Sequence, residues 1–263
     1  MALTRGTKKI FKLLAIIAAF AVFAYIVILP WVAERIAGMI PVSLEKQLGS
    51  IMYDGLVSGY KVDKEKSNLA NDFFNAMDYG SEKGYEYNIT VVRSREVNAF
   101  AIPAGDIVVY SNLLDKMQDY NEFVALLSHE YAHIEKRHSL KAIFRELSGY
   151  VVISFMFGGW ADIVHNVQSL GSLQYSRKAE KEADIYGLEM MREQGYNLDG
   201  MLQLMNTLKS DESDDESKVF EFASTHPLLK SRIKYINKYI DEHAFQQRAH
   251  YTLDSIWTLI KEE

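Results

Sequence analysis

The chain has 263 residues, enough for one sizeable domain or two small ones, and its 48% hydrophobic and 24% charged residues are typical of a folded protein. It contains no cysteine, which excludes disulfides, thiolate metal sites and a cysteine nucleophile, so a transition-metal site would have to use His, Asp and Glu. The formal net charge of −6 argues against a duplex-binding surface, and we expect no nucleic-acid partner.

The uncharged apolar segment 13–33 predicts a membrane-spanning anchor, because a helix of that length spans about 30 Å. A cleaved signal peptide is the alternative, but its apolar region would be shorter and would end in a better cleavage sequence. The preceding tail, residues 1–12, carries four basic and no acidic residues: Arg5, Lys8, Lys9 and Lys12. Positive charge resists translocation, so we expect a single-pass protein of the cell inner membrane with a cytoplasmic N-terminus and a periplasmic or extracytoplasmic main domain.

Residues 34–84 are expected to form a linker and an N-terminal helical region, with one helix over 68–77. The alternating apolar pattern at 85–92 predicts a strand, and two shorter strands follow at 97–102 and 106–110. Turn-forming residues between the last two favour a hairpin. The remaining sequence is mostly helical, so the predicted fold is mainly α with a small β-sheet.

Two later segments are less regular. Residues 147–161 are apolar but short for a membrane span, which favours a buried core segment; insertion as a hairpin is the alternative. The acidic run 211–216 is interpreted as a solvated loop, because it lacks the spaced ligands and the glycine of a calcium loop.

The chemistry of the chain is concentrated in His129-Glu130-Tyr131-Ala132-His133. On a helix the two histidines, four residues apart, share a face and can bind one metal ion. Glu130 projects beside them and can take a proton from a metal-bound water. Apolar residues around the motif predict the helix, and Asn121 is the expected cap. The alternative is a surface helix with two solvated histidines.

A catalytic zinc site needs a third protein ligand. His138 would lie about 140° round the same helix from His133, so it is not favoured. On a later helix Glu180 and Asp184 are four residues apart; Glu180 can bind the metal while Asp184 accepts the far N–H of a ligand histidine. Glu182 points away from both. By spacing alone, a charged and solvated helix explains these carboxylates equally well.

The motif together with Ser176-Arg177-x-x-Glu180-x-x-Ala183-Asp184 resembles the family of HtpX, BepA, Oma1 and the CAAX prenyl proteases, which are gluzincin zinc metalloendopeptidases. Three further segments resemble the same family: Asn98-Ala99-Phe100-Ala101-x-Pro103-x-Gly105, Val109-Tyr110-x-x-Leu113-Leu114 and Thr225-His226-Pro227-x-x-x-x-Arg232-Ile233. The likeness covers about residues 85–240 and is closer to single-anchor, membrane-bound members than to multi-span ones.

The resemblance implies an α+β zincin-like metalloprotease domain over residues 85–245, with a C-terminal helical tail over 246–263. It implies one Zn²⁺ per chain, with Glu130 as catalytic base and His226 near the metal as a transition-state or gating residue. The implied zinc ligands are His129, His133 and Glu180.

These expectations describe a membrane-anchored zinc endopeptidase that cleaves misfolded or membrane-proximal polypeptides. The tetrahedral oxyanion is expected to rest on zinc and on His226 or Arg232. An extended substrate could pair with an edge strand, although a plain core strand is an equal alternative; the candidate strand is Asn98, Ala99, Phe100 and Ala101. The alternative function is a latent or non-cleaving metallopeptidase-fold protein that acts as a chaperone-like binding or assembly factor.

Overall fold

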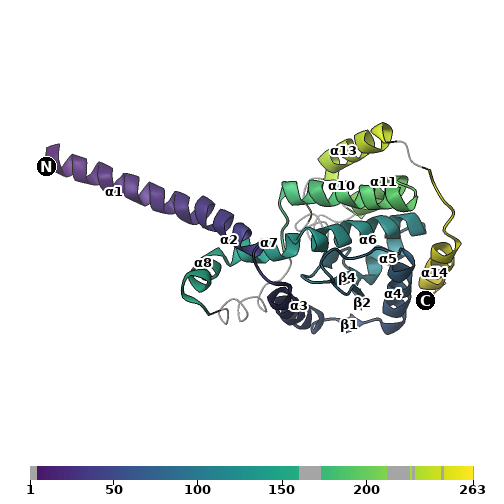
Figure 1. Cartoon of the computed structure of the whole chain (residues 1–263). Helices are drawn as coiled ribbons and strands as arrows, with labels where there is room; N and C mark the ends of the chain where they lie inside the picture. Colours follow the sequence, from purple (N-terminus) through teal and green to yellow (C-terminus); the bar gives the residue numbers. More distant parts are fainter. Residues whose placement is uncertain (1–4, 160–172, 212–225, 227–228, 244–245, 263) are drawn as a thin grey trace.

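The structure, a computed structural model, describes residues 5–159, 173–211, 226, 229–243 and 246–262. A long N-terminal helix projects from a mainly helical body that holds a small sheet (Figure 1). This confirms the predicted fold class. The helices are α1 (Arg5–Phe23), the π-helical turn η1 (Ala24–Ile28), α2 (Leu29–Ala37), α3 (Val42–Val57), α4 (Lys64–Ala76), α5 (Ser111–Lys116), α6 (Tyr120–Glu135), α7 (His138–Glu146), α8 (Ser148–Phe157), α10 (Arg177–Gln194), α11 (Asp199–Asp211), α13 (Leu229–Glu242) and α14 (Tyr251–Glu262). The strands are β1 (Lys61–Val62), β2 (Asn88–Arg93), β3 (Ala99–Ala101) and β4 (Asp106–Tyr110).

The N-terminal helix runs without a break from α1 through η1 into α2, although Pro30 lies inside it. Proline cannot donate the usual hydrogen bond and its ring crowds the preceding turn. In the π-helical turn just before Pro30, hydrogen bonds join residues five apart instead of four. The Leu29 N–H thus bonds to the Ala24 carbonyl. The stretch Lys9–Ala37 is 29 residues long and apolar enough to cross a membrane, as predicted for a membrane protein.

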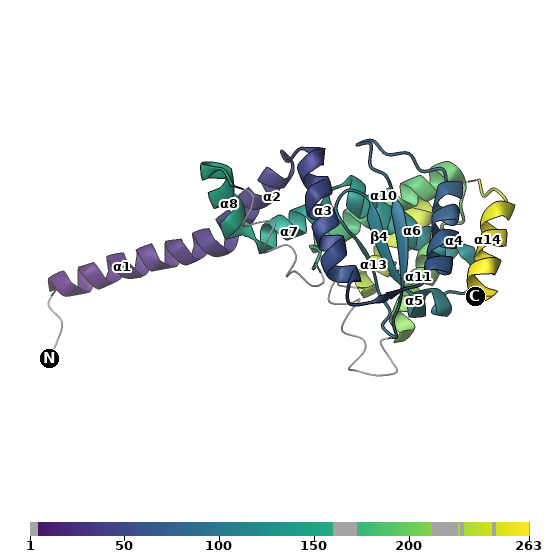
Figure 2. The same cartoon turned by 90° about the horizontal axis from the view of Figure 1, so that it is seen from below.

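Helix α8 contradicts the core segment predicted over 147–161. Its buried residues are only Ser148, Val151 and Ser154. The large apolar side chains on its other faces are exposed: Tyr150, Ile153, Phe155, Met156 and Phe157. The helix packs against α2 at the base of the projecting helix (Figure 2). Residues 160–161 and most of the acidic run, 212–216, lie outside the described residues.

The sheet has the order β1-β2-β4-β3. Strands β3 and β4 are antiparallel, with Phe100 opposite Val108, which confirms the predicted hairpin. Strand β2 instead pairs with β4 in parallel and begins at Asn88, later than the predicted strand. This order leaves β3 at the edge of the sheet.

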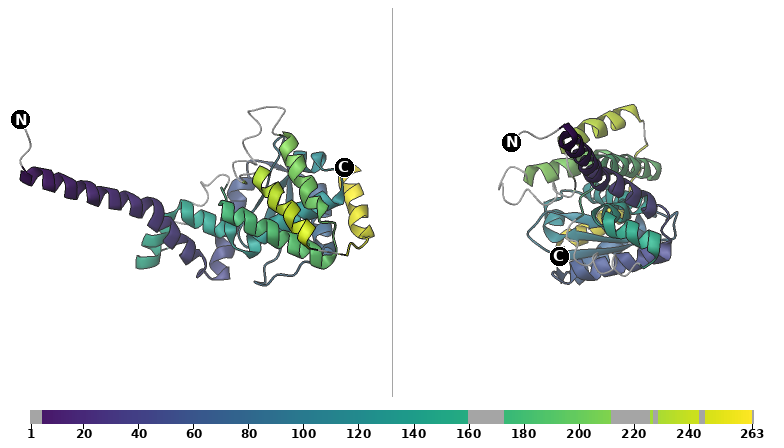
Figure 3. Two further views of the ribbon diagram at one scale, coloured as in Figure 1. Left: turned by 90° about the horizontal axis from the view of Figure 1, so that it is seen from above. Right: turned by 90° about the vertical axis from the view of Figure 1, so that its left-hand side faces the viewer.

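Helix α6 is the centre of the body. Its residues from Asn121 to Glu135 are all buried, since α10 and α11 pack on it from one side and β3 from the other (Figures 1 and 3). The cap is Asp119, whose carboxylate accepts the Asn121 N–H at 2.7 Å, so the expectation that Asn121 caps the helix was wrong.

Helices α4 and α14 share this core, although both lie outside the predicted metallopeptidase domain. The Phe123 ring of α6 lies 4.8 Å from the Phe73 ring of α4 and 5.6 Å from the Trp257 ring of α14, between centroids. At the end of α14 the Lys261 ammonium group donates to three carbonyls at the end of α5: Leu114, Asp115 and Met117.

Gly49 lets α3 pack directly on the turn between β3 and β4. A Cβ atom at this position would lie 2.1 Å from the Pro103 carbonyl oxygen. The backbone of that turn cannot yield easily, because Ile102 and Asp106 are paired across it.

We predict that Gly49→Ala lowers the free energy of unfolding by about 1–3 kcal/mol, as overpacking does. Alanine has a higher helix propensity than glycine, so propensity alone would increase the stability of this variant. A loss of stability would therefore result from the close contact with Pro103. The measurement is thermal or urea unfolding of the purified chain. Gly59→Ala is the control, because its nearest neighbour would be 4.0 Å away; equal stability of the two variants would contradict this packing.

Candidate metal centre

The turn that ends α6 brings a third histidine to the motif. Arg137 has a left-handed backbone with φ of 54°. Its side chain is held by the Glu45 carboxylate at 2.9 Å and by the Ile40 carbonyl at 2.9 Å. The helix is interrupted there, and α7 begins at His138 and continues away from the end of α6 (Figure 1); Nδ1 of His138 lies 3.1 Å from Nδ1 of His133. His138 contacts Nδ1 of His133 and is not part of the cluster of candidate ligand atoms, in agreement with the expectation that it is not the third ligand. The contact itself was not predicted, because the spacing argument assumed one continuous helix.

Four buried side chains converge beside α6: His129, His133, Glu180 and His226. Their candidate ligand atoms all lie within 4.8 Å of one another. His129 Nε2 is 3.1 Å from His133 Nε2 and 3.4 Å from His226 Nδ1. Glu180 Oε1 is 3.0 Å from His226 Nδ1 and 3.4 Å from His133 Nε2.

These separations fit a tetrahedral zinc ion. Zinc–nitrogen bonds of 2.0–2.1 Å place the corners of a tetrahedron about 3.4 Å apart. The donor set of imidazole nitrogens and one carboxylate oxygen also suits zinc. The residues that are present therefore fit the metal, with His226 at the fourth corner.

Helix α10 supplies Glu180 because it packs closely against α6. A Cβ atom at Gly187 would lie 3.2 Å from the Ser128 carbonyl group, so glycine permits this approach. The contact turns Glu180 into the cluster, where its side chain is 1% exposed. Glu182 faces the other way with a 45% exposed side chain, as its spacing from Glu180 predicts.

Asp184 lies one turn after Glu180 and supports His129. Its Oδ1 is 3.0 Å from His129 Nδ1, which favours a proton on Nδ1 and directs Nε2 into the cluster. Burial alone would raise the pKa of this carboxyl, but the charge of Arg232 and the contact with His129 lower it to about 2. Asp184 therefore remains ionised and accepts hydrogen bonds.

Arg232 of α13 joins the two carboxylates of α10. Its Nε and Nη2 donate to Asp184 at 2.8 and 2.7 Å, and its Nη1 lies 2.6 Å from Glu180 Oε2. The guanidinium group is buried, and its contacts give the carboxylates of Glu180 and Asp184 an opposite charge inside the protein. The role of Arg232 in oxyanion support stays a prediction.

Glu130 differs from the other carboxylates of the site. It is fully buried, and neither of its oxygens has a hydrogen-bond partner among the described residues. The nearest imidazole nitrogen is His226 Nε2, 3.9 Å from Oε1. Burial raises the pKa of this carboxyl. An unpartnered carboxylate that faces a cluster of ligand atoms is suited to accept a proton.

Tyr175 is a site residue that the sequence patterns did not identify. Its ring stacks on His133 with centroids 3.9 Å apart, and its hydroxyl contacts Ser139 at 2.9 Å and the Ala101 carbonyl at 3.2 Å. It thus connects the candidate substrate strand to a candidate metal ligand. Its position next to Ser176, the N-cap of α10, is the only sequence signal that could have indicated it.

Comparison with known proteins gives named relatives. Over 182 residues the chain is 29% identical to the mitochondrial metalloendopeptidase OMA1 of Schizosaccharomyces pombe, covering 67% of this chain and 53% of that protein. It is 32% identical over 162 residues to the metalloprotease LoiP of Escherichia coli, covering 58% of this chain and 62% of the relative. It is 24% identical over 184 residues to a beta-barrel assembly-enhancing protease of Yersinia pestis, covering 64% of this chain and 37% of the relative. The match therefore spans only part of the length of each of these relatives.

The family model for peptidase family M48 matches residues 62–240, which include β2, β3, β4, α6, α10 and the four converging side chains. Because this match covers more than half of the 263 residues, the chain belongs to peptidase family M48.

Proposed function

We propose that the chain is a membrane-anchored zinc endopeptidase that hydrolyses peptide bonds of misfolded or membrane-proximal proteins. The observation that carries this proposal is the four-residue cluster with the unpartnered carboxylate of Glu130 beside it. Family membership supports hydrolysis, and the S. pombe and E. coli relatives bear the names of metalloproteases.

In the proposed site His129, His133 and Glu180 hold the metal. Zinc bound there would lower the pKa of its water towards about 7 and polarise the scissile carbonyl. Glu130 accepts the proton of the attacking water on a carboxylate oxygen and later delivers it to the leaving amine. Asp184 keeps His129 in the required orientation. His226 lies where it can donate to the oxyanion or control access to the metal.

The edge strand β3 supports the binding of an extended substrate. The bonds from Ile102 N–H to Asp106 and from Tyr110 N–H to Asn98 show that even-numbered residues face β4, so Ala99 and Ala101 face outward. Two of the outward groups are in use: the Ala99 N–H bonds to Asn98 Oδ1, and the Ala101 carbonyl accepts from Ser139. Among the described residues the Ala99 carbonyl and the Ala101 N–H make no hydrogen bond, so they could pair with a peptide.

One observation favours the second function, a latent or non-cleaving protein. His226 Nδ1 occupies the corner where a catalytic zinc site keeps water or substrate. A chain that kept this arrangement would bind zinc and polypeptides without cleaving them. Zinc content measured together with casein cleavage distinguishes the two functions.

The first prediction from the proposed function concerns Glu130 as the catalytic base. Glu130→Gln should retain zinc and lose cleavage by at least about 100-fold, because an amide cannot take the proton while the ligands are unchanged. Products of casein or peptide cleavage by the wild type and the variant are compared by mass spectrometry. Turnover by the variant at the wild-type rate would refute the role of Glu130, and zinc-loaded wild type without turnover would favour the latent protein.

The second prediction separates the ligand from its neighbours on α10. Glu180→Ala should lose zinc and activity, whereas Asp184→Asn should weaken zinc binding by about 10–100-fold. Glu182→Ala is the matched control, and its stability should change by about 0.5 kcal/mol or less, because this side chain is partly exposed. The zinc content of the purified variants is the measurement. Loss of metal in Glu182→Ala with retention in Glu180→Ala would require a different ligand set.

The third prediction concerns orientation, with the catalytic domain on the periplasmic or extracytoplasmic side of the inner membrane. The basic residues before the span should keep the N-terminus in the cytoplasm. A reporter that is active only outside the cytoplasm, fused after Glu263, should therefore be active. A reporter active only in the cytoplasm, fused at the same position, is the reciprocal control, and its activity would reverse the orientation.

A further inference from the structure

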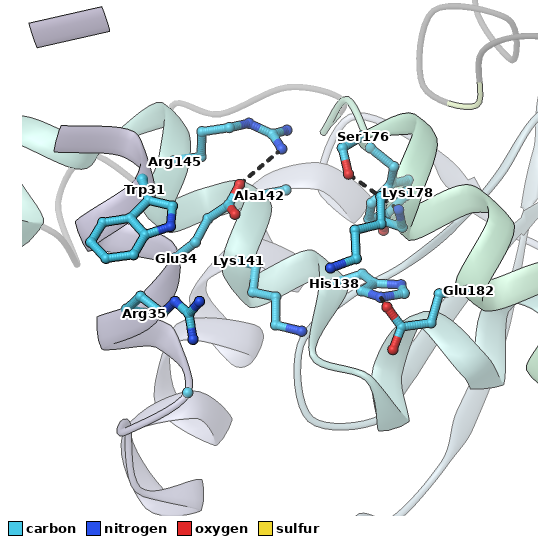
Figure 4. A pocket seen from close by; sticks show the side chains of 13 residues that line it. Trp31, Glu34, Arg35, His138, Lys141, Ala142, Arg145, Ser176, Lys178 and Glu182 are labelled. Atoms are coloured by element: carbon cyan, nitrogen blue, oxygen red, sulfur yellow. Dashed lines mark hydrogen bonds and ion pairs between the residues drawn. The ribbon is translucent and has the colours of Figure 1, made fainter. Parts of the chain in front are cut away.

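A pocket of about 450 Å³ lies where α2, α7 and the start of α10 meet (Figure 4). Its lining includes Tyr175 and His138, which contact the candidate ligand His133, but none of the four converging side chains. Its charged lining consists of four cationic side chains, Arg35, Lys141, Arg145 and Lys178, and two carboxylates, Glu34 and Glu182. Figure 4 shows Lys141 and Lys178 pointing into the same space, with Arg35 and Trp31 on the α2 side of it.

The pocket lies at the depth of lipid head groups if the N-terminal helix spans a membrane. Trp31 and Arg35 belong to the last turns of that helix, and Trp31 is 57% exposed, as is typical of a side chain at the membrane interface. Helix α8 packs on the same segment and exposes large apolar side chains, among them Ile153 and Phe157. Two apolar elements therefore flank the pocket.

The lining of the pocket carries more positive than negative charge, with four cationic side chains and two carboxylates. Glu34 is 3.4 Å from Arg145, and Glu182 is 3.5 Å from His138. Among the described residues, no carboxylate lies within ion-pair distance of the other three cations, which are Arg35, Lys141 and Lys178.

The immediate contacts of these cations do not carry negative charge. The Lys141 ammonium group donates to the Lys136 carbonyl at 2.8 Å, and Arg35 lies 5.3 Å from the centre of the Trp31 ring. Burial lowers the pKa of Lys141; the charges of Glu182 and Glu34 raise it, and the charge of Lys178 lowers it. A bound anion would offset both the burial and the repulsion between the two ammonium groups.

We propose that this pocket binds the head group of an anionic phospholipid, with Lys141, Lys178 and Arg35 around its phosphate. Clustered cations at the end of a membrane span recognise such head groups. Trp31 and the exposed face of α8 would contact the lipid at the base of its acyl chains. The pocket favours an anionic over a zwitterionic lipid, because a choline group would meet the same positive charges. This binding goes beyond the proposed peptide hydrolysis and does not require it.

The test titrates the full-length chain in neutral detergent with dioctanoyl phosphatidylglycerol and counts bound lipid by native mass spectrometry. We expect the wild type to bind it at least about tenfold more tightly than dioctanoyl phosphatidylcholine. The double variant Lys141→Gln/Lys178→Gln should lose about tenfold or more in affinity, because two cations are removed. Inorganic phosphate alone should not compete at equal concentration.

The matched control is Lys230→Gln/Lys238→Gln, which removes two exposed cations of α13 and should bind as the wild type does. The single variant Lys178→Gln covers the case in which the double variant folds poorly, because it alters only an exposed side chain. It should weaken lipid binding by about threefold. The unfolding temperature without lipid shows whether each variant is folded. Undiminished binding by folded Lys178→Gln and double variants, or equal binding of the two lipids, would overturn the proposal. Equal binding of free phosphate would assign the pocket to a soluble anion and overturn the lipid as its occupant.

Discussion

A buried arginine allows the two carboxylates of α10 to remain charged inside the protein. Removing an ion from water costs several kcal/mol even after relaxation, and Glu180 and Asp184 are both buried. Arg232 offsets this cost because its fork contacts both. The rest of the site depends on this interaction: Asp184 can then orient His129, and Glu180 can face the imidazoles. Helix α13 is therefore required for the metal centre, although it supplies none of the proposed zinc ligands.

The second constraint is the rigidity of α6 between its neighbours. Its side chains are buried on every face, so the spacing of His129, Glu130 and His133 is set by helix geometry rather than by a loop. The end of the helix is fixed as well, because Arg137 bonds to Glu45 of α3 and to the Ile40 carbonyl just before it. These contacts join the segment that follows the N-terminal helix directly to the helix that carries the motif.

The sequence allowed the local features to be predicted and missed those that depend on distant packing. The shared face of His129 and His133 follows from helical periodicity, and the hairpin follows from the turn residues at 103–105. The place of His138 depends on a left-handed turn that a non-glycine residue rarely adopts, so no local pattern indicates it. The exposed face of α8 was mistaken for core because apolar side chains suit either protein or lipid as surroundings.

The arrangement of donors also distinguishes the roles of His226 and Arg232 in the proposed reaction. All three guanidinium nitrogens of Arg232 contact Glu180 or Asp184. If Arg232 supported the oxyanion, it would weaken the contacts that hold these two carboxylates in place. His226 contacts α10 through Glu180, with its Nδ1 3.0 Å from Glu180 Oε1. Cleavage requires the fourth corner to be open, and the same ring already lies 3.9 Å from Glu130. A movement of His226 out of the corner would therefore open the site while the rigid α6 keeps Glu130 in place, which favours His226 over Arg232 as the group that meets the reacting atoms.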